Sequence, residues 1–444
     1  MPRQRKTRHL AVWMNAERIG TWTLGSNNSH AFAYEESWLV SPASRPLSLS
    51  MPLQPAAIPY RDDVVESFFD NLLPDSREIR RRIQARFHTA STRAFDLLTE
   101  IGRDCVGAVQ LLPMDHAPVG LDRIDSQALS DAEIAQLLRS TPATAFLGQH
   151  GYDEFRISLA GAQEKTALLW HEGAWRRPLG ATPTTHIFKL PLGRVGNMQA
   201  DFSTSVENEW LCAQIVSAYG LPVASCEIAA FEDQKALIVE RFDRRLAQAG
   251  THWLRLPQED CCQALGVPPG IKYECDGGPG IKAILDLLLG AQHAAADRLT
   301  FFKAQLVFWL LCATDGHGKN FSLAIEPQGR YRLTPLYDVL SAYPILGHGA
   351  NQMAPERARM AMAVTGQNRH YEWIRVLHRH WISTAHACGI SQHVAQAIIA
   401  ELIGNTPAVI AQVTAALPPT FPAQVADTIF AGVRAAATKL ADAH

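Results

Sequence analysis

The longest apolar run of the chain leads directly into a short polar loop. Residues 305–311 (QLVFWLL) are dense enough in large apolar side chains to form a buried helix, which ends where residues 314–316 (TDG) offer turn chemistry. We expect this helix to hold the polar loop at a fixed place in the fold. The loop is therefore the first candidate for a catalytic segment.

Strand-like and helical patterns alternate over the first 115 residues. Residues 9–23 predict a β-hairpin with its turn at Asn15 and Ala16, because aromatic and β-branched residues lie on both sides. Further strands are predicted over residues 31–34, 38–40 and 106–112, and helices over residues 66–73, 77–87 and 95–101. Asp75 and Ser76 are placed to cap the second helix, whose arginine-rich face suits either an acidic partner or solvent.

The remaining chain changes from mixed to helical character near residue 244. Ser130 and Glu133 form a capping box before a helix at residues 134–138. Strands are predicted over residues 186–191 and 331–333, and a helix over residues 206–219. Later helices are predicted over residues 258–265, 281–289, 298–311, 371–386, 391–403, 407–417 and 422–440. These patterns predict an α+β protein with an all-helical C-terminal part.

Composition and charge narrow the function classes. With 444 residues and 47% hydrophobic content, the chain is long enough for two or more packed domains. The 41 Lys and Arg against 43 Asp and Glu give a net charge of −2, which excludes a global basic field that binds nucleic acid unaided. A role at DNA would need a partner or a local basic patch.

Cysteine usage and the first residues indicate the compartment. The eight cysteines form no CxxC pair and stand mostly in apolar contexts, which predicts reduced, buried thiols. Residues 1–15 lack the apolar core and cleavage site of a signal peptide, and the apolar runs fall short of a membrane span. We expect a soluble, cytoplasmic protein with no membrane partner.

The polar loop contains a spacing typical of phosphotransfer. Asn320 follows Asp315 as in the protein-kinase signature HRDxxxxN, where the Asp accepts the substrate hydroxyl proton and the Asn holds a metal. Asp338 follows a predicted strand, where a kinase keeps its second magnesium-binding Asp. ATP and Mg²⁺ carry most of the charge in this reaction, so the protein supplies oxygen ligands and one base. A simpler interpretation is that Asp315 and Asn320 cap a helix and turn a loop.

Upstream segments follow the order found in kinases. Residues 156–169 are predicted to form two strands around a loop of small residues. Small side chains let backbone N–H groups approach a phosphate, but the pattern is also explained by an ordinary hairpin turn. Lys189 lies on the next strand, comparable to the VAIK strand whose Lys reaches the phosphates, although a lone strand Lys is usually an exposed charge. The following helix carries Glu207 and Glu209, and we infer that Glu209 is the partner of Lys189.

Two further segments are candidates for the surroundings of the site. Residues 236–245 are predicted to form an apolar strand that ends in charged residues. Such a segment is either a hinge whose backbone pairs with adenine or the end of a strand with solvated arginines. Residues 266–280 are rich in Gly and Pro and predict a loop, which brings Lys272 and Tyr273 near the site.

Nine motifs spread over most of the chain occur in one order. They are NLLPDS (71–76), FDLLTEIGRDCVGAV (95–109), RISLAGAQEKTALL (156–169), TPTTHIFKLP (182–191), VERFDRR (239–245), LRLPQEDCCQALG (254–266), KYECDGGPG (272–280), ATDGHGKNFS (313–322) and RLTPLYDVLSAYP (332–344). Together they resemble the HipA family of bacterial toxin serine/threonine kinases. The SLAGAQEK and DGHGKN blocks are highly specific, whereas beyond residue 344 the match is in helical character.

The resemblance implies a two-lobed protein-kinase-like fold with a β-rich N-terminal subdomain and an all-helical C-terminal lobe. ATP and Mg²⁺ would lie between the lobes. The implied domains are residues 1–115, the β-rich subdomain; 116–150, a linker with a helix; 151–243, the part of the kinase N-lobe with the phosphate loop and hinge; and 244–444, the helical C-lobe with the catalytic loop.

The resemblance also assigns roles to single residues. Asp315 would be the catalytic base, Asn320 and Asp338 the metal ligands, and Ser158 the residue that the enzyme phosphorylates on itself. The nucleotide-binding residues would be Ala160, Gly161, Ala162, Gln163, Glu164, Lys165, Lys189, Glu240, Arg241, Phe242, His317, Gly318, Lys319, Asn320, Tyr337 and Asp338. A dianion on Ser158 should repel ATP or force the phosphate loop outward, and so inactivate the kinase.

The partners implied by the resemblance are an antitoxin and a translation enzyme. Family members are held inactive by a small helix-turn-helix antitoxin (HipB-like) that binds operator DNA, and their targets resemble aminoacyl-tRNA synthetases. The chain would reach DNA through the antitoxin, and Arg375 and Arg379 would either touch phosphates or remain solvated.

Two other functions remain beside the toxin kinase. An ATP-binding corepressor would act through an antitoxin and operator without phosphotransfer, and growth inhibition that survives Asp315→Ala would favour it. A small-molecule kinase of the aminoglycoside phosphotransferase kind shares the Asp and Asn spacing. The SLAGAQEK block argues against this last function.

Overall fold

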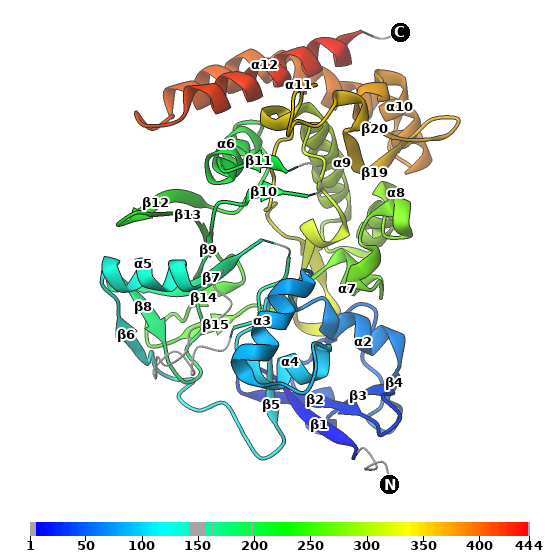
Figure 1. The fold of residues 1–444 in the computed structure, drawn as a ribbon. Helices are drawn as coiled ribbons and strands as arrows, with labels where there is room; N and C mark the ends of the chain where they lie inside the picture. The colour runs from blue at the N-terminus through cyan, green and yellow to red at the C-terminus, as the bar shows by residue number, and fades with distance from the viewer. Residues whose placement is uncertain (1–5, 142–156, 162, 197–198, 443–444) are drawn as a thin grey trace.

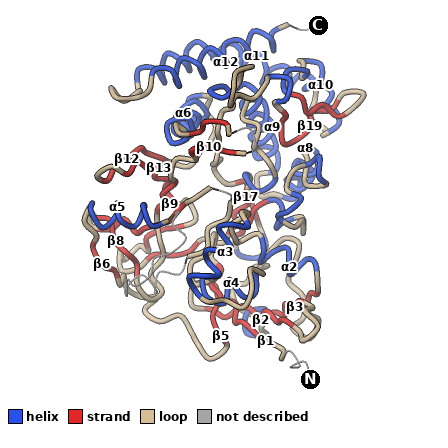
Figure 2. The backbone as a smooth tube through the Cα atoms, in the orientation of Figure 1, coloured by secondary structure: helices blue, strands red, loops and turns tan. Residues whose placement is uncertain are grey.

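The structure, a computed structural model of the 444-residue chain, describes residues 6–141, 157–161, 163–196 and 199–442. Figure 1 shows three tiers, with a sheet and helices from the N-terminal part at the bottom, a second sheet in the middle, and long helices at the top. In Figure 2 most strands lie in the lower and left parts, whereas helices fill the upper part. The two ends of the chain therefore lie at opposite ends of the molecule.

The bottom tier, here called the N-terminal subdomain, is built on a five-stranded antiparallel sheet in the order β4-β3-β2-β1-β5. Its elements are β1 (Arg8–Met14), β2 (Glu17–Leu24), β3 (His30–Tyr34), α1 (Glu36–Leu39), β4 (Tyr60–Arg61), α2 (Asp63–Asp70), α3 (Arg77–Phe87), α4 (Ala94–Ile101) and β5 (Val109–Pro113). The predicted hairpin is present, and Asn15 and Ala16 make its turn with φ values of 41° and 74°. Trp22 stacks on Phe69 at 3.9 Å between ring centroids, which packs α2 against the sheet.

The middle tier is a six-stranded antiparallel sheet in the order β12-β13-β9-β7-β8-β6 with flanking elements. They are β6 (Ser126–Ala128), α5 (Asp131–Ser140), β7 (Lys165–His171), β8 (Ala174–Pro178), β9 (His186–Lys189), β10 (Gly193–Val195), β11 (Ala200–Phe202), α6 (Ser205–Ala218), β12 (Cys226–Phe231) and β13 (Gln234–Glu240). Ser130 and Glu133 form the predicted capping box of α5. The region predicted as a linker from residue 116 thus supplies an edge strand and a packed helix, and the domain limits stay a prediction.

The C-terminal part of the chain, from residue 244, is mainly helical and forms the top tier, here called the C-terminal tier, although its first hairpin, residues 244–255, lies beside the middle sheet. Its elements are β14 (Arg244–Leu246), β15 (Trp253–Arg255), β16 (Gln258–Asp260), α7 (Cys261–Ala264), α8 (Ile281–Leu287), α9 (Ala294–Leu310), β17 (Ser322–Ile325), β18 (Tyr331–Leu333), β19 (Arg359–Thr365), β20 (Arg369–Glu372), α10 (His378–Ala387), α11 (Gln392–Ala415) and α12 (Ala423–Ala441). The sheet β16-β17-β18 and the hairpins β14-β15 and β19-β20 correct the expectation of an all-helical lobe. The C-terminal half of α9 is buried in the largest core, and α9 packs against α8, α11 and α12.

Three predicted elements differ from the structure, and in two of them a side chain bonds the backbone nearby. Residues 38–40 are predicted as a strand, but Trp38 lies in the short helix α1, and its indole donates to the Arg45 carbonyl at 3.0 Å in the segment that follows. Residues 258–265 divide into β16 and α7, because Asp260 caps α7 by accepting from the Gln263 amide at 2.8 Å. The predicted helix over residues 371–386 begins as β20 and becomes helical in α10.

The two helices predicted over residues 391–403 and 407–417 are one helix, α11, which contains Pro407 in its interior. The expectation that no apolar run reaches a membrane span is wrong for this helix, which is long and apolar enough by length and composition. Core helices of soluble proteins pass the same test. α11 packs against α6, α10 and α12 and places Leu402, Val409 and Ile410 in the core, so its apolar character has an internal explanation.

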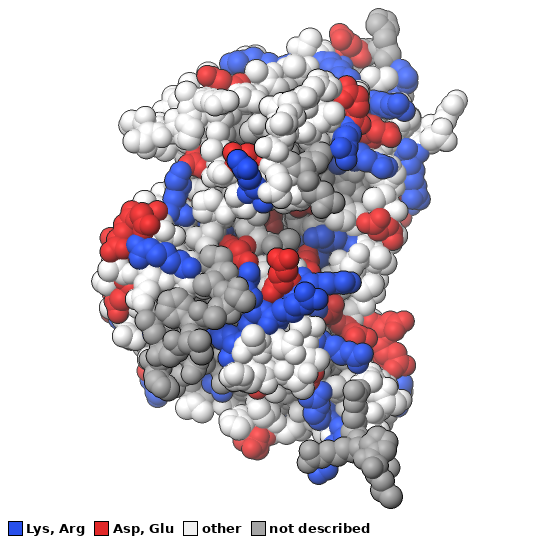
Figure 3. Space-filling model, viewed as in Figure 1, with Lys and Arg blue, Asp and Glu red and all other residues white. Residues whose placement is uncertain are grey.

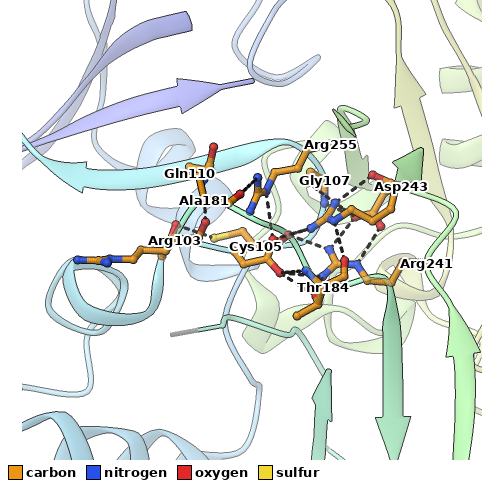
Figure 4. Close-up of polar contacts among 12 residues, drawn as sticks. Arg103, Cys105, Gly107, Gln110, Ala181, Thr184, Arg241, Asp243 and Arg255 are labelled. Atoms are coloured by element: carbon orange, nitrogen blue, oxygen red, sulfur yellow. Dashed lines mark hydrogen bonds and ion pairs between the residues drawn. The ribbon is translucent and has the colours of Figure 1, made fainter. Parts of the chain in front are cut away.

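Buried arginines and aspartates join the N-terminal subdomain to the end of the middle sheet. The group, here called the Asp104 cluster, consists of Asp104, Arg241, Asp243, Arg244 and Arg255. Oδ1 of Asp104 accepts from Arg244 at 2.9 Å and from Arg255 at 3.1 Å, while Arg241 donates to Asp243 at 2.8 Å. Figure 4 shows Arg241, Asp243 and Arg255 around the backbone of Cys105 and Gly107, which lies between α4 and β5. Burial would raise the pKa of Asp104, but the three arginines hold it well below its usual range.

Candidate active site

A cavity of 220 Å³ lies where the three tiers meet. Figure 3 shows this face of the molecule hollowed near its middle, with acidic and basic side chains around the hollow. The predicted residues that line the cavity are Ala160, Gly161, Gln163, Lys165, Lys189, Glu240, Arg241, Phe242, Asp315, His317, Lys319, Asn320, Tyr337 and Asp338. Asn71, Leu72, Asp75 and Val106 of the N-terminal subdomain line it as well, so all three tiers contribute to one site.

The loop that follows α9 places Asp315 and Asn320 at the cavity. The Tyr273 hydroxyl donates to Oδ1 of Asp315, whose side chain is 59% exposed. Protein atoms still surround this carboxyl on several sides, and the desolvation raises its pKa above the ordinary value. Nδ2 of Asn320 donates to the backbone carbonyl of Asp315 at 2.8 Å, so Asn320 turns the loop. Among the described residues, no hydrogen bond to Oδ1 of Asn320 is present.

His317 lies between these two residues and is only 4% exposed. Its ring meets Tyr273 edge-on at 5.0 Å, and its Nε2 lies 3.9 Å from Oδ1 of Asp315. Burial lowers the pKa of His317 to about 3, so the ring is neutral at pH 7. Its Nδ1 is buried and has no hydrogen-bond partner in the described part of the chain, which leaves it available to a ligand.

Lys189 on β9 joins two carboxylates from different elements. It donates to Glu209 of α6, which confirms the inferred pair, and to Oδ1 of Asp338. Burial would lower the pKa of Lys189, but Asp338 and Glu209 together raise it above its ordinary value. Burial would likewise raise the pKa of Asp338, but Lys189 and Lys165 hold it well below the usual range. Asp338 has a φ of 62°, a backbone conformation that costs about 1–3 kcal/mol outside glycine.

The small-residue loop is bound to the N-terminal subdomain. Ser158 is fully buried, and its hydroxyl donates to the Leu72 carbonyl at 2.7 Å. Its backbone nitrogen donates to the Asp104 carbonyl at 2.9 Å. In this conformation the Ser158 hydroxyl is enclosed and does not line the cavity.

The far end of the same loop does reach the cavity. Nζ of Lys165 donates to the Ala160 carbonyl at 2.5 Å, and burial lowers its pKa to about 8. Gly161 has a φ of 106°, and an added Cβ would lie 2.7 Å from Nζ of Lys165, so this position requires glycine. Glu164 instead pairs with Arg82 of α3 and does not line the cavity.

The predicted hinge lines the cavity but uses its charges elsewhere. Phe242 faces Tyr337 at 5.8 Å between ring centroids, which makes an aromatic wall. The guanidinium of Arg241 belongs to the buried Asp104 cluster, so the interpretation of a strand end with solvated arginines is wrong for this residue. The Tyr337 hydroxyl donates to the Lys319 carbonyl at 2.8 Å and so ties the wall to the loop of Asp315.

Asp75 is a cavity residue whose position the sequence prediction missed. Ser76 alone caps α3, because its side chain accepts from the Ile79 amide at 3.3 Å. The Asp75 carboxylate instead accepts from Lys272 at 2.7 Å and from Lys319 at 2.5 Å. Burial would raise the pKa of Asp75, but these two lysines lower it to about 2. Its place within the NLLPDS motif was the available signal.

Some predicted residues lie away from the cavity or outside the described residues. An added Cβ at Gly318 would lie 2.7 Å from Pro279 and 2.8 Å from Cys262, so Gly318 serves close packing. Ala162 lies outside the described residues. Arg375 and Arg379 are exposed on the C-terminal tier and do not line the cavity.

A cavity between a mainly β tier and a mainly helical tier, with a Lys–Glu pair, an Asp–Asn loop and a second Asp, defines a protein-kinase-like enzyme. The family models "HipA-like C-terminal domain" and "HipA N-terminal domain" match residues 157–410 and 10–112. The chain therefore belongs to the HipA family.

Similar proteins agree with this assignment. The provisionally named kinase Y4mE of Sinorhizobium fredii is 37% identical over 347 residues, which cover 76% of this chain and 79% of the relative. The serine/threonine-protein kinase toxin HipA of Shewanella oneidensis is 27% identical over 348 residues, or 76% of each chain. A chain of the S. oneidensis MR-1 complex of HipA, HipB and operator DNA shares the fold, with a TM-score of 0.80 over 97% of both chains at 22% identity. The predicted family, two-lobed fold and protein-kinase class are confirmed.

Proposed function

We propose that the chain is an ATP-dependent serine/threonine-protein kinase that acts as the toxin of a toxin–antitoxin pair. The observation that carries the proposal is the meeting of Lys189, Asp315, Asn320 and Asp338 at one cavity. Lys189 and Asp338 are in contact although 149 positions separate them along the chain. This set of residues is the one that phosphoryl transfer from a magnesium nucleotide requires.

The proposed chemistry assigns the proton to Asp315. The oxygen of a substrate hydroxyl bonds the γ-phosphorus, the bond from that phosphorus to ADP breaks, and the hydroxyl proton passes to Asp315. Its raised pKa favours this acceptance. Lys189, held by Glu209, binds phosphate oxygens, and the wall of Phe242 and Tyr337 receives the adenine.

The donor set fits Mg²⁺. Asn320 offers an amide oxygen, and Asp338 offers a carboxylate that stays ionised, both of which are hard oxygen ligands. Among the described residues no group of three His, Cys, Asp or Glu residues is arranged to hold a metal. This agrees with kinase sites, where phosphate oxygens and water complete the coordination and the cation neutralises the phosphates.

We also propose Ser158 as a self-phosphorylation site that switches the enzyme off. The buried hydroxyl donates to Leu72, so the loop must leave the N-terminal subdomain before Ser158 meets a nucleotide. A phosphate on Ser158 carries about −1.5 to −2 charges and no longer fits this enclosed position. The loop would then lose its closed conformation, and with it the position of Lys165.

The proposed partners are a HipB-like antitoxin, operator DNA reached through it, and an aminoacyl-tRNA synthetase as the phosphorylated protein in the cytoplasm. The similar S. oneidensis complex contains HipA, HipB and operator DNA, which supports the first two. The net charge of −2 supports an indirect route to DNA.

The decisive experiment is labelling with ATP. Wild-type protein incubated with Mg²⁺ and γ-labelled ATP is expected to become labelled on Ser158, and the Asp315→Ala protein is expected to stay unlabelled. Equal labelling of both proteins would contradict the proposal. Phosphoproteomics after brief expression of the two proteins would then identify the target, and growth inhibition that survives Asp315→Ala would favour the corepressor instead.

A further inference from the structure

Asp75 lies where three loops of the cavity meet. Its carboxylate accepts from Lys272 in the Gly- and Pro-rich loop and from Lys319 in the loop of Asp315. Its backbone nitrogen donates to the carbonyl of Gly161 in the small-residue loop at 3.0 Å. One residue of the N-terminal subdomain, in the turn just before α3, therefore contacts each of these loops.

The contacts of Asp75 are enclosed enough to constrain both lysines. The side chains of Asp75 and Lys272 are each 14% exposed, and that of Lys319 is 4% exposed. The two ammonium groups bond different oxygens of the same carboxylate, so they lie side by side. Without the carboxylate the two positive charges would repel each other in a region with little solvent to screen them.

The same loops bear on Asp315 through short covalent and hydrogen-bonded paths. Tyr273, which follows Lys272, donates to Asp315. The backbone nitrogen of Gly318, which precedes Lys319, donates to the Lys272 carbonyl at 3.4 Å. A shift of either lysine would therefore also shift the surroundings of Asp315.

We propose that Asp75 is a positioning residue for phosphotransfer, contributed by the N-terminal subdomain, which holds Lys272 and Lys319 beside Asp315. The inference rests on the proposed kinase function and adds a role for a subdomain outside the two lobes. The two ammonium groups meet the phosphoryl group in a fixed orientation, whereas Asp75, as an anion, repels the triphosphate. Asp75 thus favours the transition state at the expense of nucleotide binding.

The test separates rate from affinity in the full-length protein. In Asp75→Asn, the maximal rate of phosphotransfer at saturating ATP is expected to fall at least about tenfold, because the lysines lose their fixed orientation. The dissociation constant of a non-hydrolysable ATP analogue, measured by calorimetry, is expected to stay equal or to decrease, because the repelling anion is gone. A merely structural defect would instead weaken rate and binding together.

Two further variants guard against a folding defect. Asp75→Glu keeps the charge and is expected to recover part of the rate and the wild-type affinity. Asp70→Asn is the matched control, because Asp70 forms a 2.6 Å ion pair with Arg80 at the same corner but does not line the cavity. Its rate and affinity are expected to equal those of the wild type. In a Lys272→Gln background, Asp75→Asn is expected to lower the rate by a smaller factor, since the two residues act together.

The outcomes also separate this inference from the kinase proposal. A wild-type rate in Asp75→Asn, additive effects with Lys272→Gln, or a joint loss of rate and affinity that Asp75→Glu does not recover would each overturn the inference and leave the kinase intact. If the wild type transfers no phosphate, the kinase proposal fails. The positioning role of Asp75 in phosphotransfer then fails with it.

Discussion

Two clusters of charged side chains join the N-terminal subdomain to the rest of the molecule, and they are built from different cations. The Asp104 cluster uses three arginines, whose planar groups donate to carboxylates and to backbone carbonyls with side chains 0–7% exposed. The cavity uses lysines, which are point charges on flexible stems. The arginines of the Asp104 cluster are held by carboxylates and backbone carbonyls, even where Arg241 borders the cavity, whereas lysines can turn from a carboxylate to a phosphate.

The comparison also shows which observation distinguishes the candidate active site from the Asp104 cluster, which has a structural role. Asp104 is a buried carboxylate and Asp338 a partly buried one, and neighbouring cations hold the pKa of both well below the usual range. A perturbed pKa alone would therefore mark both regions as functional. The difference is that Asp338 lines a cavity, together with a buried His317 nitrogen that has no partner among the described residues. Space and an unsatisfied polar atom, more than the pKa shift, indicate the active site.

The largest effect is expected from a substitution that disrupts the Asp104 cluster, the structural link between the N-terminal subdomain and the middle sheet. Asp104→Asn removes the anion that Arg241, Arg244 and Arg255 share and leaves three buried guanidinium groups with less opposing charge. We expect the free energy of unfolding to fall by about 3–5 kcal/mol, the usual cost of breaking a buried ion pair from one side. Denaturant unfolding of purified full-length protein measures this change.

The matched control for the unfolding of Asp104→Asn is again Asp70→Asn, which removes a partly exposed ion pair from the same subdomain. Its expected cost is at most about 1 kcal/mol. Equal stability of the Asp104→Asn and Asp70→Asn proteins would show that the Asp104 cluster is not the structural joint. A loss of phosphotransfer in still-folded Asp104→Asn would show that the two clusters are not separable in function.

The second largest effect is expected from a substitution in the candidate active site. Asp338→Asn keeps the shape of the side chain and leaves Lys189 paired with Glu209, but it removes one negative oxygen ligand. We expect the rate of phosphotransfer to fall about 10²- to 10³-fold, the range for loss of one electrostatic contact to the transition state. The unfolding midpoint should change far less than in Asp104→Asn. Near-wild-type labelling by this variant would exclude Asp338 from the proposed metal site.

The fold was predictable where the signal is local. The capping box of Ser130 and Glu133 and the turn at Asn15 are read from neighbouring residues, and both are present. β19 was not predicted, because the residues RMAMAVT show no clear alternation and their strand is set by distant contacts. One such contact is the Ala363 amide, which donates to Glu274 at 2.6 Å. Tertiary partners of this kind override weak local preference.

The candidate site was predictable where spacing within one loop carries the chemistry. Asp315 and Asn320 stand in one loop, and Lys189 has a helix with Glu209 close behind it in the chain, so motif order indicated them. The contacts of Asp75 lie 197 and 244 positions away, at Lys272 and Lys319. No local sequence pattern can predict these two contacts, because Asp75 and the two lysines are brought together only by the packing of the three tiers.

The smallest effect is expected in the pH dependence of nucleotide affinity, which tests the difference between lysine and arginine at position 165. Burial lowers the pKa of Lys165 to about 8 from an ordinary value of 10.5, so its positive charge is present at pH 7 and is lost as the pH rises through 8. Affinity for an ATP analogue is therefore expected to fall between pH 7 and pH 9, by at most about fivefold, because a partly exposed ion pair contributes up to about 1 kcal/mol. Lys165→Arg stays charged over this range and should show a flatter profile. Parallel profiles for the two proteins, measured by calorimetry at constant ionic strength, would mean that Lys165 does not hold the phosphates and that another group sets the pH dependence.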